Sequence, residues 1–341
     1  MTMKSPPTLR DVAQLAGVSS AIASRVLNLD PKVRVREDTR RRVQEAAEEL
    51  GYVPHSLARS LRGARTGAIG LVMHGLDSPI NIHVLEGAHS RCAQSGFVTL
   101  LAEAEDLAQD DDQFGVFLAR GRLDGVILHS GYGAEDRLVE AISRTVPAVL
   151  VNADGGRDVP TVRVDDAAAA ELATAHLLGL GHEDITFLAG AAGSESSARR
   201  ESGYLSALTS ADLAESADMV DAGWWTDSGA RAIDALLARP RLPTGIVVAN
   251  AVAATGALSA LRSAGVHVPR EISVVTIHDS WFLDHLSVPL TAVRLPLHAL
   301  GSAAATLLID SLNGEDVPQD AFITEPGPEL VLRESTGQPR T

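Results

Sequence analysis

Residues 8–19 read TLRDVAQLAGVS, and residues 20–28 continue with SAIASRVLN. Apolar side chains recur three and four positions apart in the first stretch, which is the period of an amphipathic helix. Thr8 is a suitable N-cap for this helix, Asp11 places a carboxylate in its first turn, and Gly17 ends it. The stretch therefore predicts a short, capped helix that buries one apolar face.

Two more helices are predicted directly after the first. Ser19 is a suitable cap for residues 20–27, and residues 37–50 form another amphipathic stretch that ends at Gly51. Two helices joined by a short glycine-containing turn predict a helix-turn-helix, whose second helix enters the major groove of DNA. The N-terminal part of the chain is therefore expected to be an all-α DNA-binding headpiece.

The amino-acid sequence of the headpiece also resembles that of a known family. Beyond residues 8–19, the matching segments are SRVLN at 24–28, GYVP at 51–54 and ARSL at 58–61. These segments resemble the signature of the lactose/galactose-repressor (LacI/GalR) family of transcription regulators. The resemblance implies a repressor that binds a pseudo-palindromic operator as a homodimer and is controlled by a small-molecule effector.

The resemblance also implies which headpiece residues contact DNA. Ser20 and Ala21 occupy the family's two main specificity positions, and Arg25 matches a base-contacting arginine one turn later. Arginine in the major groove suits bidentate contact with guanine. Ile22 departs from the family's usual threonine, so one phosphate contact of the family is not expected here. The predicted DNA-binding residues are Thr8, Ser19, Ser20, Ala21, Ser24, Arg25, Asn28, Ala58 and Leu61, and Arg34, Arg36 and Arg40 are further candidates for phosphate contacts.

Residues 55–62, after Pro54, read HSLARSLR. A segment of this length is too short for a stable isolated helix, which agrees with folding on binding. The resemblance implies a hinge helix that forms on the operator, and Leu61 matches the leucine that wedges into the minor groove. A plain interdomain linker is the alternative interpretation.

From residue 68 onward, apolar runs alternate with helical stretches. The runs are continuous and rich in β-branched residues, which is typical of parallel strands covered on both faces by helices. They lie at residues 68–72, 97–101, 125–128, 148–151, 185–188, 245–249 and 272–277. The pattern predicts an α/β body of two doubly wound parallel-sheet lobes, in which ligands bind at the carboxyl ends of the strands.

The resemblance implies that this body is like a periplasmic sugar-binding protein, with a cleft between two lobes. The chain is expected to cross between the lobes near Val164, near Ala292 and near Gln319. The predicted organisation is a helix-turn-helix domain at residues 1–53, a hinge and linker at 54–66, and an effector-binding and dimerisation domain at 67–341, with a first lobe at 67–163 and 293–318 and a second lobe at 165–291 and 320–335.

Ser78 and Asn152 end predicted strands of the first lobe, which makes them candidates for the cleft. The resemblance implies four more, Arg200, Trp224, Asn250 and His278, which match cleft positions of the family. These six are the predicted effector-binding residues. In sugar-binding members of the family, the arginine at the position of Arg200 hydrogen-bonds ligand hydroxyls. A sugar-like effector is the first expectation, and a corepressor-dependent, nucleoside-responsive or acid-responsive regulator is the alternative.

Two departures from the family bear on the effector. Ala251 and His278 stand where acidic residues are usual, which favours an effector that is less polar than a hexose, or one that is itself anionic. An imidazole in the cleft also suggests the hypothesis that effector binding depends on pH.

The charge of the chain is unevenly distributed. The formal net charge is −15. Residues 1–62 hold 11 lysines and arginines against 7 acidic residues, a net of +4, whereas the remainder holds 18 against 37, a net of −19. A basic headpiece on an acidic body is compatible with DNA contact through the headpiece alone.

Several kinds of site are not expected. Cys92 is the single cysteine, so neither an internal disulfide nor a cysteine metal site is predicted, and the histidines show no metal spacing. No cofactor is expected. The sequence lacks a P-loop, a dinucleotide fingerprint, a G-x-S-x-G motif and an H-E-x-x-H motif, so we do not expect an enzyme.

Localisation and the competing classes of protein follow from the same reading. The sequence has no apolar signal segment at its start and no membrane-length apolar run, which predicts a cytoplasmic protein without a membrane partner. A pure solute-binding protein would carry a signal peptide and no helix-turn-helix. An α/β enzyme with a DNA anchor would need a catalytic constellation in the cleft.

Overall fold

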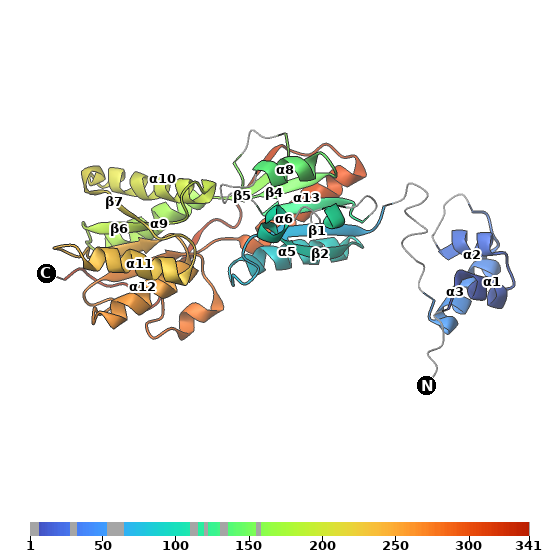
Figure 1. The fold of residues 1–341 in the computed structure, drawn as a ribbon, viewed down its shortest axis with the longest axis horizontal. Coiled ribbons are helices and arrows are strands. Elements are labelled where there is room, and N and C mark those ends of the chain that lie inside the picture. The colour runs from blue at the N-terminus through green and yellow to red at the C-terminus, as the bar shows by residue number, and fades with distance from the viewer. Residues whose placement is uncertain are drawn as a thin grey trace. The chain divides into compact units, whose positions relative to one another are not determined.

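The computed structural model describes residues 7–27, 33–52, 65–109, 115–118, 122–129, 136–154 and 158–340. The chain divides into two compact units, Met1–Gly67 and Ala68–Thr341. Figure 1 labels the helices and strands of each unit. Three of the predicted DNA-binding residues, Asn28, Ala58 and Leu61, lie outside the described residues, as does most of the predicted hinge.

In the described part of the N-terminal unit there are three helices: α1 (Leu9–Ala16), α2 (Ser20–Leu27) and α3 (Glu37–Leu50). At the start of α1, Thr8 Oγ1 accepts a hydrogen bond from the Asp11 amide, and the Asp11 carboxylate accepts one from the Thr8 amide at 2.8 Å. The Thr8 hydroxyl also donates to the Asp11 carboxylate at 2.7 Å, and this bond, together with the one from the Thr8 amide, lowers the pKa of Asp11. Val12, Val26 and Val43, one from each helix, are fully buried together. The predicted helix-turn-helix headpiece is confirmed.

The second unit contains two six-stranded sheets. The first has the order β11-β5-β4-β3-β1-β2, and its strands are β1 (Ala68–Met73), β2 (Val98–Glu103), β3 (Gly125–His129), β4 (Ala148–Val151), β5 (Thr161–Val164) and β11 (Asp320–Ile323). The second has the order β12-β10-β9-β8-β6-β7, and its strands are β6 (Ile185–Ala189), β7 (Asp218–Asp221), β8 (Gly245–Val248), β9 (Ser273–Ile277), β10 (Thr291–Arg294) and β12 (Glu329–Val331). All pairings are parallel except that of β12 with β10.

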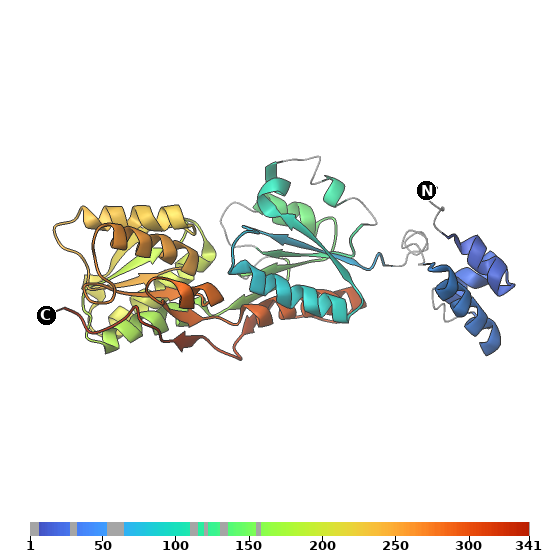
Figure 2. The same ribbon diagram turned by 90° about the horizontal axis from the view of Figure 1, so that it is seen from below.

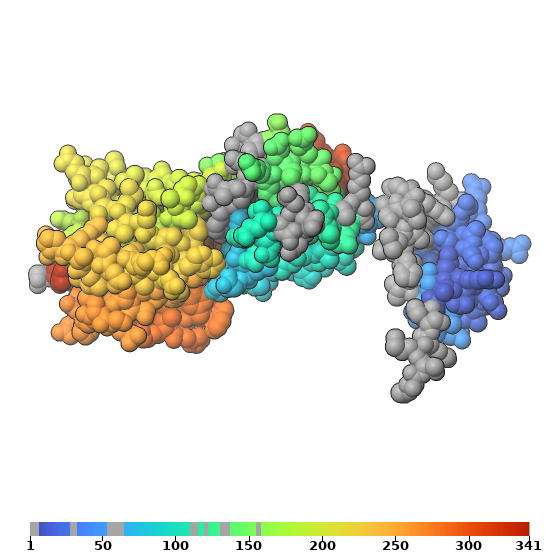
Figure 3. Space-filling model, in the orientation of Figure 1, coloured from blue at the N-terminus to red at the C-terminus, as the bar shows by residue number. Residues whose placement is uncertain are grey.

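Each sheet with its helices forms one lobe. The first lobe holds α5 (Asn81–Gln94), α6 (Ala104–Gln109), α8 (Asp136–Ser143) and α13 (Leu297–Asn313). The second lobe holds α9 (Asp166–Gly179), α10 (Glu195–Ser210), α11 (Thr226–Leu237) and α12 (Ala251–Ser263). Figure 3 shows the second lobe as a continuous surface coloured from yellow-green to orange. The two doubly wound α/β lobes predicted from the sequence are confirmed.

The crossings between the lobes correct the predicted boundaries. The chain leaves the first sheet after Val164, returns to the first lobe after Arg294, and leaves it again after Ile323. The crossing placed near Gln319 was wrong, because residues 320–323 pair with β5 in the first sheet. Residues 293–294, assigned to the first lobe, instead complete β10 in the second sheet, where the Val293 carbonyl accepts a hydrogen bond from the His278 amide.

Glycines allow the helices of each lobe to pack closely. A Cβ on Gly301 of α13 would lie 1.9 Å from the Val84 carbonyl of α5, and one on Gly87 of α5 would lie 2.0 Å from the His298 carbonyl of α13. Figure 2 shows α5 and α13 side by side along one face of the first sheet.

No helix within the described part of the chain combines the length and apolar character that a membrane crossing requires.

Candidate functional site

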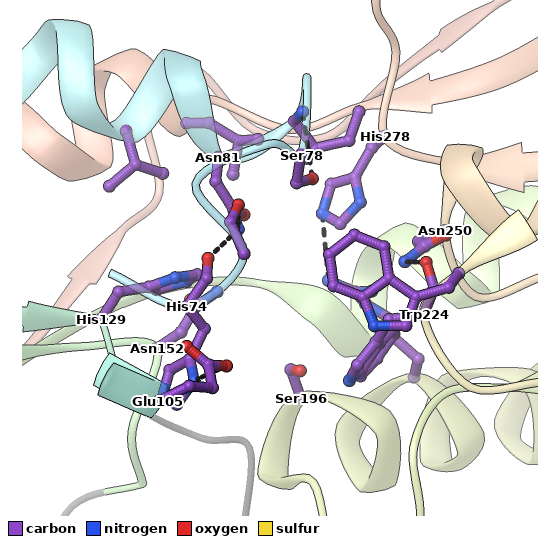
Figure 4. A pocket seen from close by; sticks show the side chains of 16 residues that line it. His74, Ser78, Asn81, Glu105, His129, Asn152, Ser196, Trp224, Asn250 and His278 are labelled. Carbon is purple, nitrogen blue, oxygen red and sulfur yellow. Dashed lines mark hydrogen bonds and ion pairs between the residues drawn. The ribbon is translucent and has the colours of Figure 1, made fainter. Parts of the chain in front are cut away.

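A cavity between the two lobes encloses about 750 Å³ of space, part of it open to solvent. Both lobes contribute to its wall, as Figure 4 shows, with His74, His129 and Asn152 on one side and Trp224 and Asn250 on the other. All six residues predicted to bind an effector line this cavity: Ser78, Asn152, Arg200, Trp224, Asn250 and His278. The six predicted residues, which come from six separate stretches of the chain, therefore lie around one cavity.

Asn152 and His278 occupy equivalent places in the two lobes. Asn152 follows β4 and His278 follows β9, and these strands have the same position in their sheets. Both residues adopt left-handed backbone conformations, with φ of 64° and 71°, which asparagine and histidine tolerate better than most residues. Both side chains are more than nine-tenths buried, and neither Asn152 Oδ1 nor His278 Nδ1 has a hydrogen-bond partner within the described residues.

Arg200 is buried at the base of the cavity and uses most of its donors within the protein. Its Nε and Nη2 donate to Asp166 Oδ1 at 2.9 and 2.7 Å, and its Nη1 donates to the Ala249 carbonyl at 2.7 Å. The guanidinium also lies 5.5 Å from the centre of the Trp224 ring. A guanidinium has five N–H donors, and a further one bonds to His278, so a single N–H on Nη1 is left for a ligand.

His278 is held in one neutral form. Arg200 Nη2 lies 3.1 Å from His278 Nε2. Because a guanidinium can only donate, Nε2 accepts and the ring proton resides on Nδ1. Burial and the neighbouring positive charge of Arg200 keep the pKa of His278 well below its ordinary value. The pH-dependent binding that the sequence suggested is therefore not expected near neutral pH.

Other residues of the cavity wall were not predicted from the sequence. His74 Nδ1 lies 2.6 Å from Glu105 Oε1, and Asn81 donates to the His74 carbonyl at 2.7 Å. His74 and His129 stand at the carboxyl ends of β1 and β3, so the rule that identified Asn152 applies to them as well. Trp225 reaches from the second lobe to Gly75 of the first, where a Cβ would lie 2.7 Å from the indole.

Comparisons with known proteins agree with this architecture. Residues 8–55 match the model described as bacterial regulatory proteins, lacI family, and residues 174–336 match a periplasmic binding protein-like domain. The HTH-type transcriptional repressor PurR of Pasteurella multocida (strain Pm70) is 30% identical over 336 residues, which cover 96% of this chain and 98% of that protein. The chain belongs to the lacI family of bacterial regulatory proteins.

Two solved structures resemble the chain over nearly its whole length. The lac repressor dimer bound to operator and the anti-inducer ONPF has a TM-score of 0.84 and 28% identity, covering 98% of this chain and 100% of that one. The transcriptional regulator CelR in complex with cellobiose has a TM-score of 0.69 and 29% identity, covering 96% of this chain and 99% of that one. The prediction of a DNA-binding transcription regulator with a periplasmic-binding-protein-like body is confirmed.

The lacI-family headpiece presents part of α2 to solvent. Ser20, Ala21 and Arg25 are exposed on this helix, whereas Ala23 and Val26 are buried in the headpiece core. Of the other predicted contacts, Thr8 and Ser19 are exposed and serve as helix caps, and Ser24 is half-buried. This lacI-family chain shows no cluster of metal-binding side chains among its described residues.

Proposed function

We propose that this lacI-family protein is a repressor that binds a pseudo-palindromic operator as a homodimer and responds to a small-molecule effector in the interlobe cavity. The observation that carries the proposal is the presence, in one chain, of an exposed helix-turn-helix surface and a cavity lined by buried polar side chains. The similar proteins support both halves, since one is named a repressor and others are solved with an operator or with a small molecule. A regulator of this kind acts in the cytoplasm and without catalysis.

On the DNA side, α2 is the recognition helix of the proposal. Ser20 and Ala21 lie near its exposed start, and Arg25 follows one turn later. Arginine at such a site reads guanine by two parallel hydrogen bonds, whereas a serine hydroxyl discriminates less between bases. We therefore assign the largest single contribution to base recognition to Arg25, and we assign Thr8, Ser19, Ser24, Asn28, Ala58 and Leu61 to backbone and minor-groove contacts.

Gel retardation with the DNA upstream of the protein's own gene tests this half. Arg25→Ala should weaken specific binding by about 1–3 kcal/mol, roughly a factor of 5 to 150. Arg144→Ala is the matched control, because Arg144 is an exposed arginine of the body that directly follows α8 and pairs with Glu140 of that helix. Retention of the DNA by a chain lacking residues 1–62 would contradict the proposal.

On the effector side, the cavity wall favours a neutral ligand that carries several hydrogen-bonding groups. The carboxylate of Asp166 accepts hydrogen bonds from Arg200, and that of Glu105 lies against His74. Because both carboxylates have partners in the protein, neither of them selects a positively charged ligand. Besides the guanidinium of Arg200, which is paired with Asp166, the remaining polar groups of the wall are amides, imidazoles, hydroxyls and indoles. Such groups suit a sugar-like molecule, with amides bonding hydroxyls and Trp224 contacting the ring face.

A thermal-shift screen with cellobiose, glucose, ribose and adenosine tests this half. A ligand at 100 times its dissociation constant adds about 2.7 kcal/mol to the free energy of unfolding. Ser196→Trp, which fills the cavity, should abolish the shift, whereas Ser206→Trp on the exposed face of the same helix should retain it. Equal shifts in both variants would mean that the molecule binds elsewhere.

A further inference from the structure

We propose that Arg199 is a latch that holds the two lobes together, and that Asp166 links this latch to the cavity. Arg199 lies on α10 of the second lobe, one position before Arg200, and its side chain is only 15% exposed. It does not line the cavity. Its contacts nevertheless connect the cavity wall with the first lobe.

The latch consists of contacts between α10 and the segment that follows β4. Arg199 Nη2 donates to the Asn152 carbonyl at 3.1 Å, and Arg199 Nη1 donates to the Asp154 carboxylate. Glu195, at the start of α10, accepts a hydrogen bond from the Asp154 amide at 2.6 Å. Two charged side chains of the second lobe, Arg199 and Glu195, thus form hydrogen bonds with one short segment of the first lobe. This segment includes Asn152 of the cavity wall.

The first-lobe end of the latch is anchored to the sheet. Asp154 also accepts a hydrogen bond from Arg163 of β5 at 3.0 Å. Arg163 in turn donates to Asp320 of β11 at 2.6 Å and lies over the ring of Phe322, 4.4 Å from its centre. Strands β5 and β11 are the two from which the chain leaves the first lobe. A displacement of Asp154 is therefore transmitted to the strands next to these crossings.

The link to the cavity is the carboxylate of Asp166, which has no exposed surface. Its Oδ2 accepts from Arg199 at 2.8 and 3.2 Å, while its Oδ1 accepts from Arg200 at 2.7 and 2.9 Å. A ligand that accepts from Arg200 Nη1 and draws the guanidinium toward the cavity weakens the hydrogen bonds of Arg200 Nε and Nη2 to Asp166. The freed carboxylate oxygen then draws Arg199 away from Asn152 and Asp154, which loosens the latch.

The distance between the lobes, measured in the full chain, tests the latch. Spin labels on Thr145→Cys in the first lobe and Ser263→Cys in the second report this distance by double electron–electron resonance. Native Cys92 will not interfere, because it is fully buried and burial raises its pKa to about 11. Labelled chains are diluted into an excess of unlabelled chains, so that only distances within one chain are recorded, without DNA or effector.

We expect one narrow distance distribution for the otherwise native chain. Arg199→Met should shift the distribution to longer distances or broaden it, and Arg199→Lys, which keeps the charge, should restore part of the native distribution. Arg239→Met is the matched control, because Arg239 pairs at 2.6 Å with Asp218 inside the second lobe. A distribution for Arg199→Met identical to that of the control overturns the latch.

The link through Asp166 has its own test. All hydrogen bonds seen for Arg200 stay within the second lobe, yet Arg200→Lys should broaden the interlobe distribution, because Asp166 then competes more strongly for Arg199. Arg200→Met should do the same to a greater extent, and circular dichroism shows whether each variant is folded. An unchanged distribution for a folded Arg200 variant overturns the link. These measurements need neither operator nor effector, so their failure is distinct from a failure of the proposed function.

Discussion

His278 is a histidine that the structure holds neutral, and its neighbours explain why. It is buried, and Arg200 donates to its Nε2 at 3.1 Å. The native pKa is therefore well below the ordinary value. Below about pH 6.5 the unfolded chain binds a proton at this site that the native chain does not bind, so the free energy of unfolding falls as the pH falls.

We predict that His278→Asn makes the stability of the protein less dependent on pH. Asparagine tolerates the left-handed backbone at this position. Between pH 6 and 5, the native chain should lose up to about 1.4 kcal/mol per pH unit more than the variant, as chemical denaturation at each pH would measure. His267→Asn, at an exposed position, is the control. Equal slopes for native protein and His278→Asn would show that His278 is protonated in the folded state.

Six residues of the cavity wall were predicted from the sequence, but their hydrogen-bond partners were not. Asn152 and His278 directly follow strands and Asn250 lies two residues after one, so the local sequence pattern places them at the carboxyl ends of the strands. The choice of Asp166 as the partner of both Arg199 and Arg200 depends on how α9 packs against α10. Nothing in the alanine-rich sequence around Asp166 signals that partnership.

At the scale of elements, glycines allow the helices on a sheet face to pack closely against one another. Gly301 of α13 and Gly87 of α5 face the backbone of the opposite helix, where no side chain has room. Gly301→Ala should therefore destabilise the protein by about 1–3 kcal/mol, because the helices must separate or shift. The midpoint of urea unfolding measures the change.

Gly179→Ala is the matched control for this prediction. Gly179 ends α9, and a Cβ there would meet nothing within 4 Å. Alanine is the better helix former, so this variant should be stabilised by about 0.5–1 kcal/mol. A Gly301→Ala variant as stable as the control would contradict the close packing of α5 and α13.

The strands that the sequence revealed are those with an uninterrupted apolar run, since β4 and β8 were predicted although they are no longer than β11. The long apolar strands of the two sheet centres, such as β1 and β9, were predicted, because they are buried on both faces. Strand β11 was not predicted from the sequence, because its four residues are partly exposed and it pairs with β5, which is far away in the chain. That omission is why the third crossing was placed too early.

At the scale of the whole molecule, the charge division separates DNA contact from effector binding. The net charge of +4 in residues 1–62 attracts phosphates, and the net charge of −19 in the remainder repels them. Association with DNA should therefore depend on basic side chains of the headpiece and on none of the body. The exposed side chain of Arg36, just before α3, is one of these candidates.

The salt dependence of operator binding distinguishes the two parts. Each phosphate contact releases counterions, so the logarithm of the association constant falls with the logarithm of salt concentration by about 0.9 per contact. Arg36→Gln should reduce this slope by about 0.9 and weaken binding equally to operator and to unrelated DNA, because phosphate contacts carry no sequence information. Arg231→Gln, at an exposed position of α11 in the acidic body, should leave the slope unchanged. Fluorescence anisotropy from 50 to 300 mM salt measures both slopes, and a change caused by Arg231→Gln would place DNA on the body and contradict the division.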